Sequence, residues 1–141
     1  MMQIKFTETD EEIARCFPVM LQLRPHLIES EFVERIRVQE RQNYRLAFVE
    51  RENKVCAVAG LRVNDNLSWG RFMYIDDLVA DETERSQGLG SQLFEWCRDY
   101  ALRMGCSMLL LDSGVQRFDA HRFYLGKRMS ISSHRFSMGL K

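Results

Sequence analysis

The sequence predicts one domain of the α/β (α+β) class, with a central twisted mixed sheet flanked by helices. In the middle of the chain, apolar residues alternate or form short continuous runs, as in strands, and before and after it they recur at helical spacing. The chain has 141 residues. A domain of this size buries roughly two-thirds of the surface of its unfolded chain, so we expect residues 1–141 to share one core.

Composition narrows the range of partners. The 20 basic and 20 acidic residues balance, so overall charge gives no reason to expect nucleic acid or a membrane surface as a partner. The N-terminal segment MMQIKFTETDEE lacks the apolar run of a signal peptide, and no stretch approaches the ~20 apolar residues of a membrane span. We therefore expect a cytoplasmic protein.

The cysteines predict neither a metal site nor a disulfide. They are far apart in the sequence, without a Cys-x-x-Cys pair or a Cys/His cluster. Each has apolar neighbours, which is typical of buried, reduced thiols. The four residues are Cys16, Cys56, Cys97 and Cys106.

The first forty or so residues predict a short strand and two helices. Residues Gln3–Phe6 alternate as an edge strand would. Thr9 and Glu12 have the spacing of a capping box, which marks the start of a helix, and Pro18 is expected to kink that helix. Ser30 is the expected cap of a second helix that runs to about residue 42.

From residue 44 onward the pattern changes to strands, followed by a long amphipathic helix and three shorter elements. In chain order, the expected elements are strands at Tyr44–Glu50, Val55–Val63 and Trp69–Ala80, a helix at Leu89–Met104, a strand at Ser107–Leu111, a helix at Phe118–Gly126 and a strand at Ile131–Met138.

The segment Arg85-Ser86-Gln87-Gly88-Leu89-Gly90 lies between an expected strand and the long helix. Its two glycines let backbone amides approach a ligand, and the free amides and positive dipole end of a helix N-terminus attract phosphate. A dinucleotide site of the Rossmann type would have a third glycine where this chain has Leu93, and the Gly-Lys-Ser/Thr of a P-loop is absent. The segment predicts a phosphate site of another kind.

This segment resembles the acetyl-CoA motif of the GNAT family of N-acetyltransferases, Gln/Arg-x-x-Gly-x-Gly/Ala, at every defined position. Leu78-Val79-Ala80 is similar to the end of the strand that precedes the motif in that family, and Ala120-His121-Arg122-Phe123-Tyr124 matches its later Ala-x-x-Phe-Tyr sequence. The resemblance implies an acyltransferase of class EC 2.3.1. It would transfer acetyl from acetyl-CoA, as cosubstrate, to a primary amine of a small molecule or a protein, by direct attack in a ternary complex.

The resemblance also implies which residues bind the cofactor. Backbone groups of Leu78, Val79 and Ala80 would pair with the pantetheine arm like an additional strand, and an amide near Leu78 or Val79 would stabilise the oxyanion. Backbone amides of the glycine segment would hold the pyrophosphate. The residues implied are Arg85, Ser86, Gln87, Gly88, Leu89, Gly90 and Ser91.

Tyr124 is the candidate general acid, since the matching tyrosine of the family protonates the departing CoA thiolate. A phenol with a pKa near 10 and a thiol with a pKa near ~8.5 are close enough for this transfer. The alternative is a helix tyrosine that packs beside Phe123.

Asp76 and Asp77 are candidates for taking the amine proton, directly or through water, because carboxylates inside an apolar strand need water or a partner. Alternation along the strand would place one on each face, so that only one would line the site. The residues do not decide between the two, and a buried salt bridge is the alternative role.

Arg24 and His26 lie between the first two helices, where this family forms part of its acceptor pocket, and His121 shares a helix face with Tyr124. Arg117 stands where the family commonly has an asparagine, so the resemblance does not show whether Arg117 contacts CoA.

The rival function is a noncatalytic acyl-CoA-binding module. The sequence identifies neither the amine nor whether the chain forms a homodimer.

Overall fold

The computed structural model describes residues 2–85 and 87–141 in two compact units, of which the first ends at Leu110 and the second is Leu111–Lys141. The described part contains a five-stranded sheet in the order β1-β2-β3-β4-β5. Its strands are β1 Met2–Phe6, β2 Tyr44–Arg51, β3 Lys54–Asn66, β4 Gly70–Ala80 and β5 Met108–Leu111. The helices are α1 Asp10–Arg15, α2 Phe17–Leu23, α3 Glu29–Glu40, α4 Leu89–Arg103 and α5 Phe118–Gly126, with a 3-10 turn, η1, at Glu82–Glu84.

The first four strands are antiparallel neighbours. The amide of Ser107, just before β5, donates to the carbonyl of Arg71 near the start of β4, at 2.8 Å. Both strands therefore start at the same end of the sheet and run parallel, joined by the crossover through α4. The mixed sheet expected from the sequence is confirmed.

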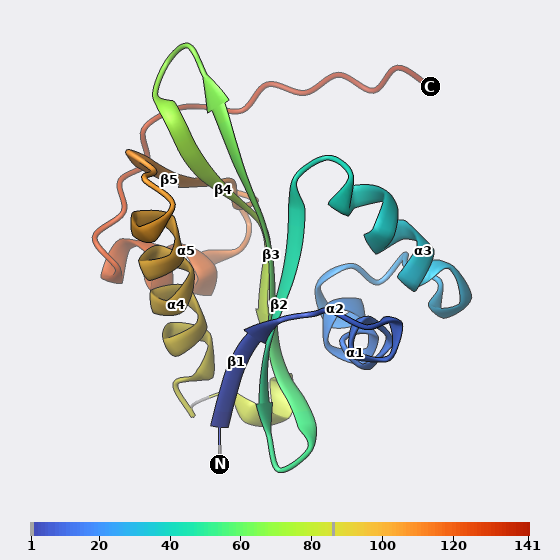
Figure 1. Ribbon diagram of the computed structural model, residues 1–141. Coiled ribbons are helices and arrows are strands. Elements are labelled where there is room, and N and C mark those ends of the chain that lie inside the picture. The colour runs from blue at the N-terminus through green and yellow to red at the C-terminus, as the bar shows by residue number, and fades with distance from the viewer. Residues whose placement is uncertain (1, 86) are drawn as a thin grey trace. The chain divides into compact units, whose positions relative to one another are not determined.

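Helices cover both faces of the sheet in the first unit (Figure 1). Helices α1 to α3 pack on one face and α4 on the other, as strand alternation requires. Leu46, Phe48 and Val58 belong to the core beneath α1 to α3. Their sequence neighbours Ala47 and Val49 point to the opposite face and are equally buried. The two cores share one sheet.

The N-terminal helices depart from the prediction in two places. The capping box at Thr9 and Glu12 is confirmed, but the kinked helix expected to follow is two helices that meet at Cys16. Pro18 stands in the first turn of α2, where proline is tolerated because the amide that it lacks has no intrahelical acceptor. The cap of α3 is Ile28 and not Ser30, so that α3 begins before the expected position.

The β2–β3 hairpin, strand β4 and helix α4 agree with the elements expected from the sequence. Glu52 and Asn53 both have positive φ, as a tight β2–β3 hairpin turn requires. Helix α4 begins at Leu89 as expected, and Gly105, with a φ of 77°, follows its end.

In the second unit, α5 has the predicted bounds, but the strand expected at Ile131–Met138 is wrong. Residues 129–141 form neither helix nor strand, and Ile131 and Phe136 are 77% and 93% exposed. A strand needs a neighbour to receive its backbone hydrogen bonds, and α5 is the one regular element that lies wholly within residues 111–141, all of which are described. The alternation of apolar and polar residues predicted a strand here, but it contains no information about whether another strand lies beside it.

The four cysteines are free thiols. Cys16, Cys56 and Cys97 are buried, as expected, whereas the same expectation is wrong for Cys106, which is half-buried. Burial raises the pKa of Cys16 and of Cys97 to about 12, so both are protonated at neutral pH. Across the described residues, the helices all fall short of the length and apolar character needed to cross a membrane.

The capping box gives folding a defined pH dependence. Lys5 pairs with the Glu12 carboxylate, and the amides of Glu8 and Thr9 donate to it, which lowers the pKa of Glu12 from 4.5 to about 2. A lowered pKa stabilises the fold above the unfolded-state value and loses that effect as pH falls toward the folded-state value.

We expect Glu12→Gln to lower the free energy of unfolding at pH 7 by about 1 kcal/mol, because the glutamine keeps the cap but not the charge. The difference from the unmodified protein should shrink as pH falls from 4.5 toward 2. Urea denaturation at several pH values measures it. Glu11→Gln, in the same exposed first turn, is the control, and an equal effect of both variants would contradict the account.

Candidate active site

A β-bulge in β4 brings Asp76 and Asp77 to the same face of the sheet. Ile75 is opposite Leu61 and Asp77 is opposite Gly60, so that Asp76 is an additional residue with no partner of its own on β3. The bulge interrupts the alternation of side chains. Both carboxylates consequently line the pocket on the α1–α3 face, and the expectation of one aspartate on each face is wrong.

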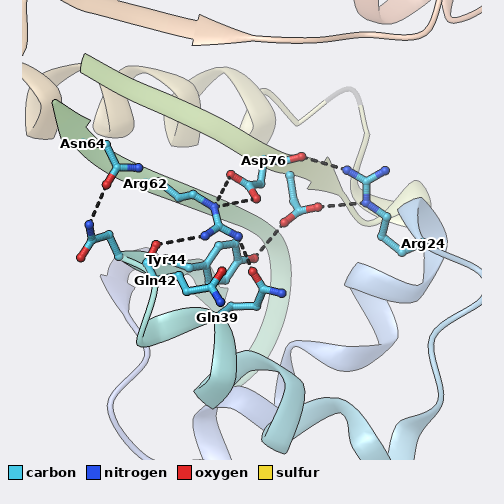
Figure 2. Close-up of polar contacts among 9 residues, drawn as sticks. Arg24, Gln39, Gln42, Tyr44, Arg62, Asn64 and Asp76 are labelled. Atoms are coloured by element: carbon cyan, nitrogen blue, oxygen red, sulfur yellow. Dashed lines mark hydrogen bonds and ion pairs between the residues drawn. The ribbon is translucent and has the colours of Figure 1, made fainter. Parts of the chain in front are cut away.

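Asp77 is held by two donors from different elements. The Nε of Arg24, at the end of α2, donates to its Oδ1 at 2.9 Å, and the hydroxyl of Tyr44 on β2 donates to its Oδ2 at 2.8 Å. Arg24 also donates through Nη2 to the carbonyl of Asp76, at 2.8 Å. These contacts tie α2 and β2 to the bulge (Figure 2).

Asp76 is paired with Arg62 of β3. The Nε of Arg62 lies 3.1 and 3.0 Å from the two carboxylate oxygens. The rest of the guanidinium donates to the carbonyl of Gln42, at 3.0 Å, and to the side chain of Gln39 (Figure 2). Burial raises the pKa of Asp76; the Arg62 contacts oppose this increase, and the nearby charge of Asp77 adds to it.

Tyr44 reaches Asp77 because Gly60 leaves room for its ring. A Cβ on Gly60 would lie 1.9 Å from the Tyr44 hydroxyl oxygen and 2.3 Å from the ring carbon that bears it. Burial, the Asp77 charge and the hydrogen bond raise the pKa of Tyr44 well above its ordinary value. The phenol thus stays protonated and donates.

Tyr44 and Arg62 were not identified from the sequence, because they belong to strands expected to contribute mainly to the core. The one available signal was Gly60, because a glycine inside an apolar strand often marks a bulge or a close approach.

The pocket beside Asp76, Asp77 and their hydrogen-bond partners has a volume of about 330 Å³. It contains the aspartate pair together with Arg24 and His26, the two residues expected at an acceptor pocket. The structure thus brings these four residues together, while their roles stay predictions. The lining residues are Met20, Arg24, His26, Leu27, Phe32, Arg35, Ile36, Gln39, Tyr44, Tyr74, Asp76 and Asp77.

The glycine segment forms the start of α4. Gly88 has a φ of 75° and occupies the N-cap position, where it has no side chain to cap the helix. Leu89 is buried in the core, and a Cβ on Gly90 would lie 4.0 Å from the Cβ of Ala80. The first amides of a helix have no intrahelical acceptor, so this turn has the backbone geometry of an anion site.

The other described residues of the glycine segment are exposed or partly exposed to solvent. Arg85 and Gln87 are exposed, and Ser91 is half-buried in the first turn of α4. Ser86, also expected at the cofactor, lies outside the described residues.

Leu78, Val79 and Ala80 form the end of β4 and pair with β3 on one side. On the other side, β5 starts beside Arg71 and is four residues long. In a parallel ladder it therefore ends at about Ile75. The β5 side of Leu78–Ala80 lies beyond the end of β5, where an extended ligand has backbone groups to pair with.

Comparison with known proteins decides the family. The model of the acetyltransferase (GNAT) family matches residues 6–128. The chain belongs to the GNAT acetyltransferase family. Its resemblance to that family in sequence is thus confirmed, and the family identifies it as an acyltransferase of the N-acetyltransferase class.

Two curated relatives are similar to this GNAT chain. An uncharacterized N-acetyltransferase of Bacillus subtilis (strain 168), YhdJ, is 31% identical over 138 residues, which cover 96% of this chain and 97% of that protein. The aminoalkylphosphonate N-acetyltransferase of Salmonella typhimurium is 33% identical over 99 residues, covering 70% of this chain and 63% of that protein.

Solved GNAT-like structures share the fold. A GNAT family acetyltransferase of Staphylococcus aureus aligns with a TM-score of 0.83 at 17% identity, over 99% of this chain and 98% of that chain. Glucosamine-6-phosphate N-acetyltransferase of Arabidopsis thaliana aligns with a TM-score of 0.77 at 24% identity, over 100% and 99%.

In the second unit of this GNAT chain, Tyr124 lies on α5 with its ring edge-to-face against Phe123, the centroids 5.4 Å apart. Burial raises its pKa, and the charge of Arg117 opposes the increase. The Nε2 of His121 lies 2.7 Å from the carbonyl of Gly114, which ties this ring to the preceding loop. The packing of Tyr124 on Phe123 is the alternative role considered from the sequence, and catalysis stays a prediction.

The fit of Tyr44 over Gly60 can be tested by stability. We expect Gly60→Ala to lower the free energy of unfolding by about 1–3 kcal/mol, because the new methyl group displaces the Tyr44 ring and its hydrogen bond to Asp77. Urea denaturation measures the change. Gly126→Ala is the control, since a Cβ there meets no described atom within 4 Å. Equal stability of the Gly60 variant and the unmodified protein would contradict the described fit.

Proposed function

We propose that this protein transfers the acetyl group of acetyl-CoA to a primary amine of a small molecule or a protein, within a ternary complex. The supporting observation is the order of groups along β4. Asp76 and Asp77 face the pocket, Leu78–Ala80 follow with one edge beyond the end of β5, and the chain then enters the glycine turn of α4. The proposed acceptor and cofactor groups would thus lie a few residues apart along β4.

Acetyl-CoA would bind mainly to the main chain. The backbone of Leu78–Ala80 would pair with the pantetheine arm, and amides of Arg85–Ser91 would hold the pyrophosphate. The positive φ of Gly88, and its lack of a side chain at the N-cap position of α4, support this arrangement. The thioester would supply the acetyl group that the amine attacks.

Asp76 is the proposed proton acceptor for the amine, directly or through water. Its raised pKa suits a general base better than an ordinary carboxylate does. Asp77 would instead position the site, because one of its oxygens accepts from Arg24 and the other from Tyr44. Each carboxylate oxygen has two lone pairs, so the contact of Asp76 with Arg62 leaves acceptor capacity.

A backbone amide near Leu78 or Val79 would stabilise the oxyanion, and Tyr124 would protonate the CoA thiolate. Tyr124 is proposed from the match of its segment to the family motif. A covalent acetyl-cysteine is not part of the scheme, since burial raises the pKa of all four cysteines and a thiol that stays protonated is a poor nucleophile. The similarity to an enzyme named for aminoalkylphosphonates supports a small molecule as the acceptor.

The test is thiol release from acetyl-CoA by the purified protein across small amines, amino acids, and lysine-containing peptides. We expect release with at least one amine class and only background release without amine. Binding of CoA without release for every class would instead support the rival function, a noncatalytic acyl-CoA-binding module.

Tyr124→Phe tests the proposed acid. We expect kcat to fall by about 10²-fold or more, because the thiolate would leave unprotonated, while the Kd for acetyl-CoA changes little. Initial-rate assays of thiol release measure kcat, and calorimetric titration measures the Kd for acetyl-CoA. His134→Gln, an exposed residue of the same unit, is the control. An unchanged kcat in the Tyr124 variant would remove this residue from the mechanism.

Gly88→Ala tests the proposed pyrophosphate site. At a φ of 75° alanine is strained by about 1–2 kcal/mol, so the turn should change shape and the affinity for acetyl-CoA should fall by roughly tenfold. Gly105→Ala is the matched control, because Gly105 also has a positive φ, of 77°, but follows the opposite end of α4. Calorimetric titration with acetyl-CoA compares the variants, and equal Kd values for both would argue against the site.

A further inference from the structure

We propose that the pocket selects an amine that also carries an anionic group, and that Arg35 binds this anion. The inference rests on the proposed acetyl transfer and names the class of acceptor. The acceptor would be a short zwitterionic molecule whose amine faces Asp76 and whose anion faces α3.

The balance of charge around the pocket favours such a molecule. Arg62 pairs with Asp76 and Arg24 pairs with Asp77. Arg35 also lines the pocket, and in the described part of the chain its side chain forms no ion pair. Each aspartate thus has an arginine of its own, Arg35 is an additional cation at the pocket, and an incoming ammonium group would add a further positive charge. An anion on the same molecule restores the balance at the point where a cation is available.

The placement of Arg35 suits a separate anion site. Phe32, Arg35 and Ile36 follow one another at helical spacing on α3 and line the pocket, with Phe32 and Ile36 buried. Arg35 itself is exposed, so its guanidinium is accessible from solvent. The aspartates belong to β4, so amine and anion would contact different walls of the pocket.

The size of the pocket limits the length of this molecule. About 330 Å³ is at the lower end of the range for small-molecule sites. His26 lines the same pocket and, within the described residues, has no side-chain partner, so it offers a second donor to the anion. A short amino acid, aminophosphonate or aminosulfonate has the required groups.

The experiment compares kcat/KM for amines matched in length, with and without the anion. The anionic probes are β-alanine, 2-aminoethylphosphonate and taurine, which separate carboxylate, phosphonate and sulfonate; n-propylamine and a lysine peptide are the comparison amines. We expect the best anionic amine to exceed propylamine and the peptide by about tenfold or more.

Arg35→Gln should lower kcat/KM for that anionic amine by about tenfold to hundredfold, mainly through KM, and leave propylamine unchanged. Arg35→Lys should restore part of the loss, because it keeps the charge but not the planar fork. Arg41→Gln is the matched control: this residue caps α3, is exposed, and is not among the pocket residues.

Equal use of propylamine and the anionic amines, or equal effects of the Arg35 and Arg41 variants, would overturn the inference. Absence of turnover with every amine would instead contradict the proposed function. In that case, calorimetric titration of the anionic probes into the CoA-saturated protein decides the anion site by itself: weaker binding to the Arg35→Gln variant supports it, and equal binding or none overturns it.

Discussion

The additional residue in β4 is the constraint on which the site depends. A regular strand would direct Asp76 and Asp77 to opposite faces, one toward α4 and one toward α1–α3. The bulge opposite Gly60 directs both toward the same pocket. Two adjacent carboxylates repel one another, and each is costly to bury without a partner. The fold meets this requirement with one arginine for each aspartate, supplied by β3 and by the end of α2.

The two carboxylates also differ in their surroundings. Asp77 accepts from Arg24 and Tyr44 through separate oxygens, and Tyr44 occupies its position because Gly60 has no side chain. Asp76 has a raised pKa, since burial outweighs its contact with Arg62. A carboxylate held by two donors, beside one whose pKa is raised by burial, is an arrangement in which one can accept a proton while the other keeps its contacts.

A feature could be predicted from the sequence where it depends on residues close together in the chain, and not where it depends on residues far apart in the chain. The capping box at Thr9, the start of α4 at Leu89 and the bounds of α5 follow from local patterns, and the structure confirms them. The bulge at Asp76 was not predictable, because it depends on the register between β3 and β4. Arg62 and Tyr44 were missed for the same reason. The expected strand at Ile131–Met138 shows the reverse case, since alternation there has no neighbouring strand.

The proposed cofactor site and the proposed acceptor site differ in how far each can be predicted from the sequence. The proposed acetyl-CoA contacts use main-chain groups of β4 and α4, whose geometry requires glycine at Gly88 and so leaves a recognisable motif. The proposed acceptor contacts use side chains from α2, α3 and β4, which come together only in the fold. A family motif therefore predicted the cofactor class, while the charge pattern of the proposed acceptor pocket became apparent only from the structure.

The most direct test of the central claim is the pH dependence of kcat for the unmodified protein, Asp76→Asn and Asp77→Asn, with acetyl-CoA and amine both saturating. The account predicts that activity of the unmodified protein falls with decreasing pH, at an apparent pKa above the ordinary 3.8 of aspartate. Asp76→Asn should lose about 10²-fold or more in kcat together with this acidic limb, whereas Asp77→Asn should retain the limb. An acidic limb that persists unchanged in Asp76→Asn would contradict the assignment of Asp76 as the base.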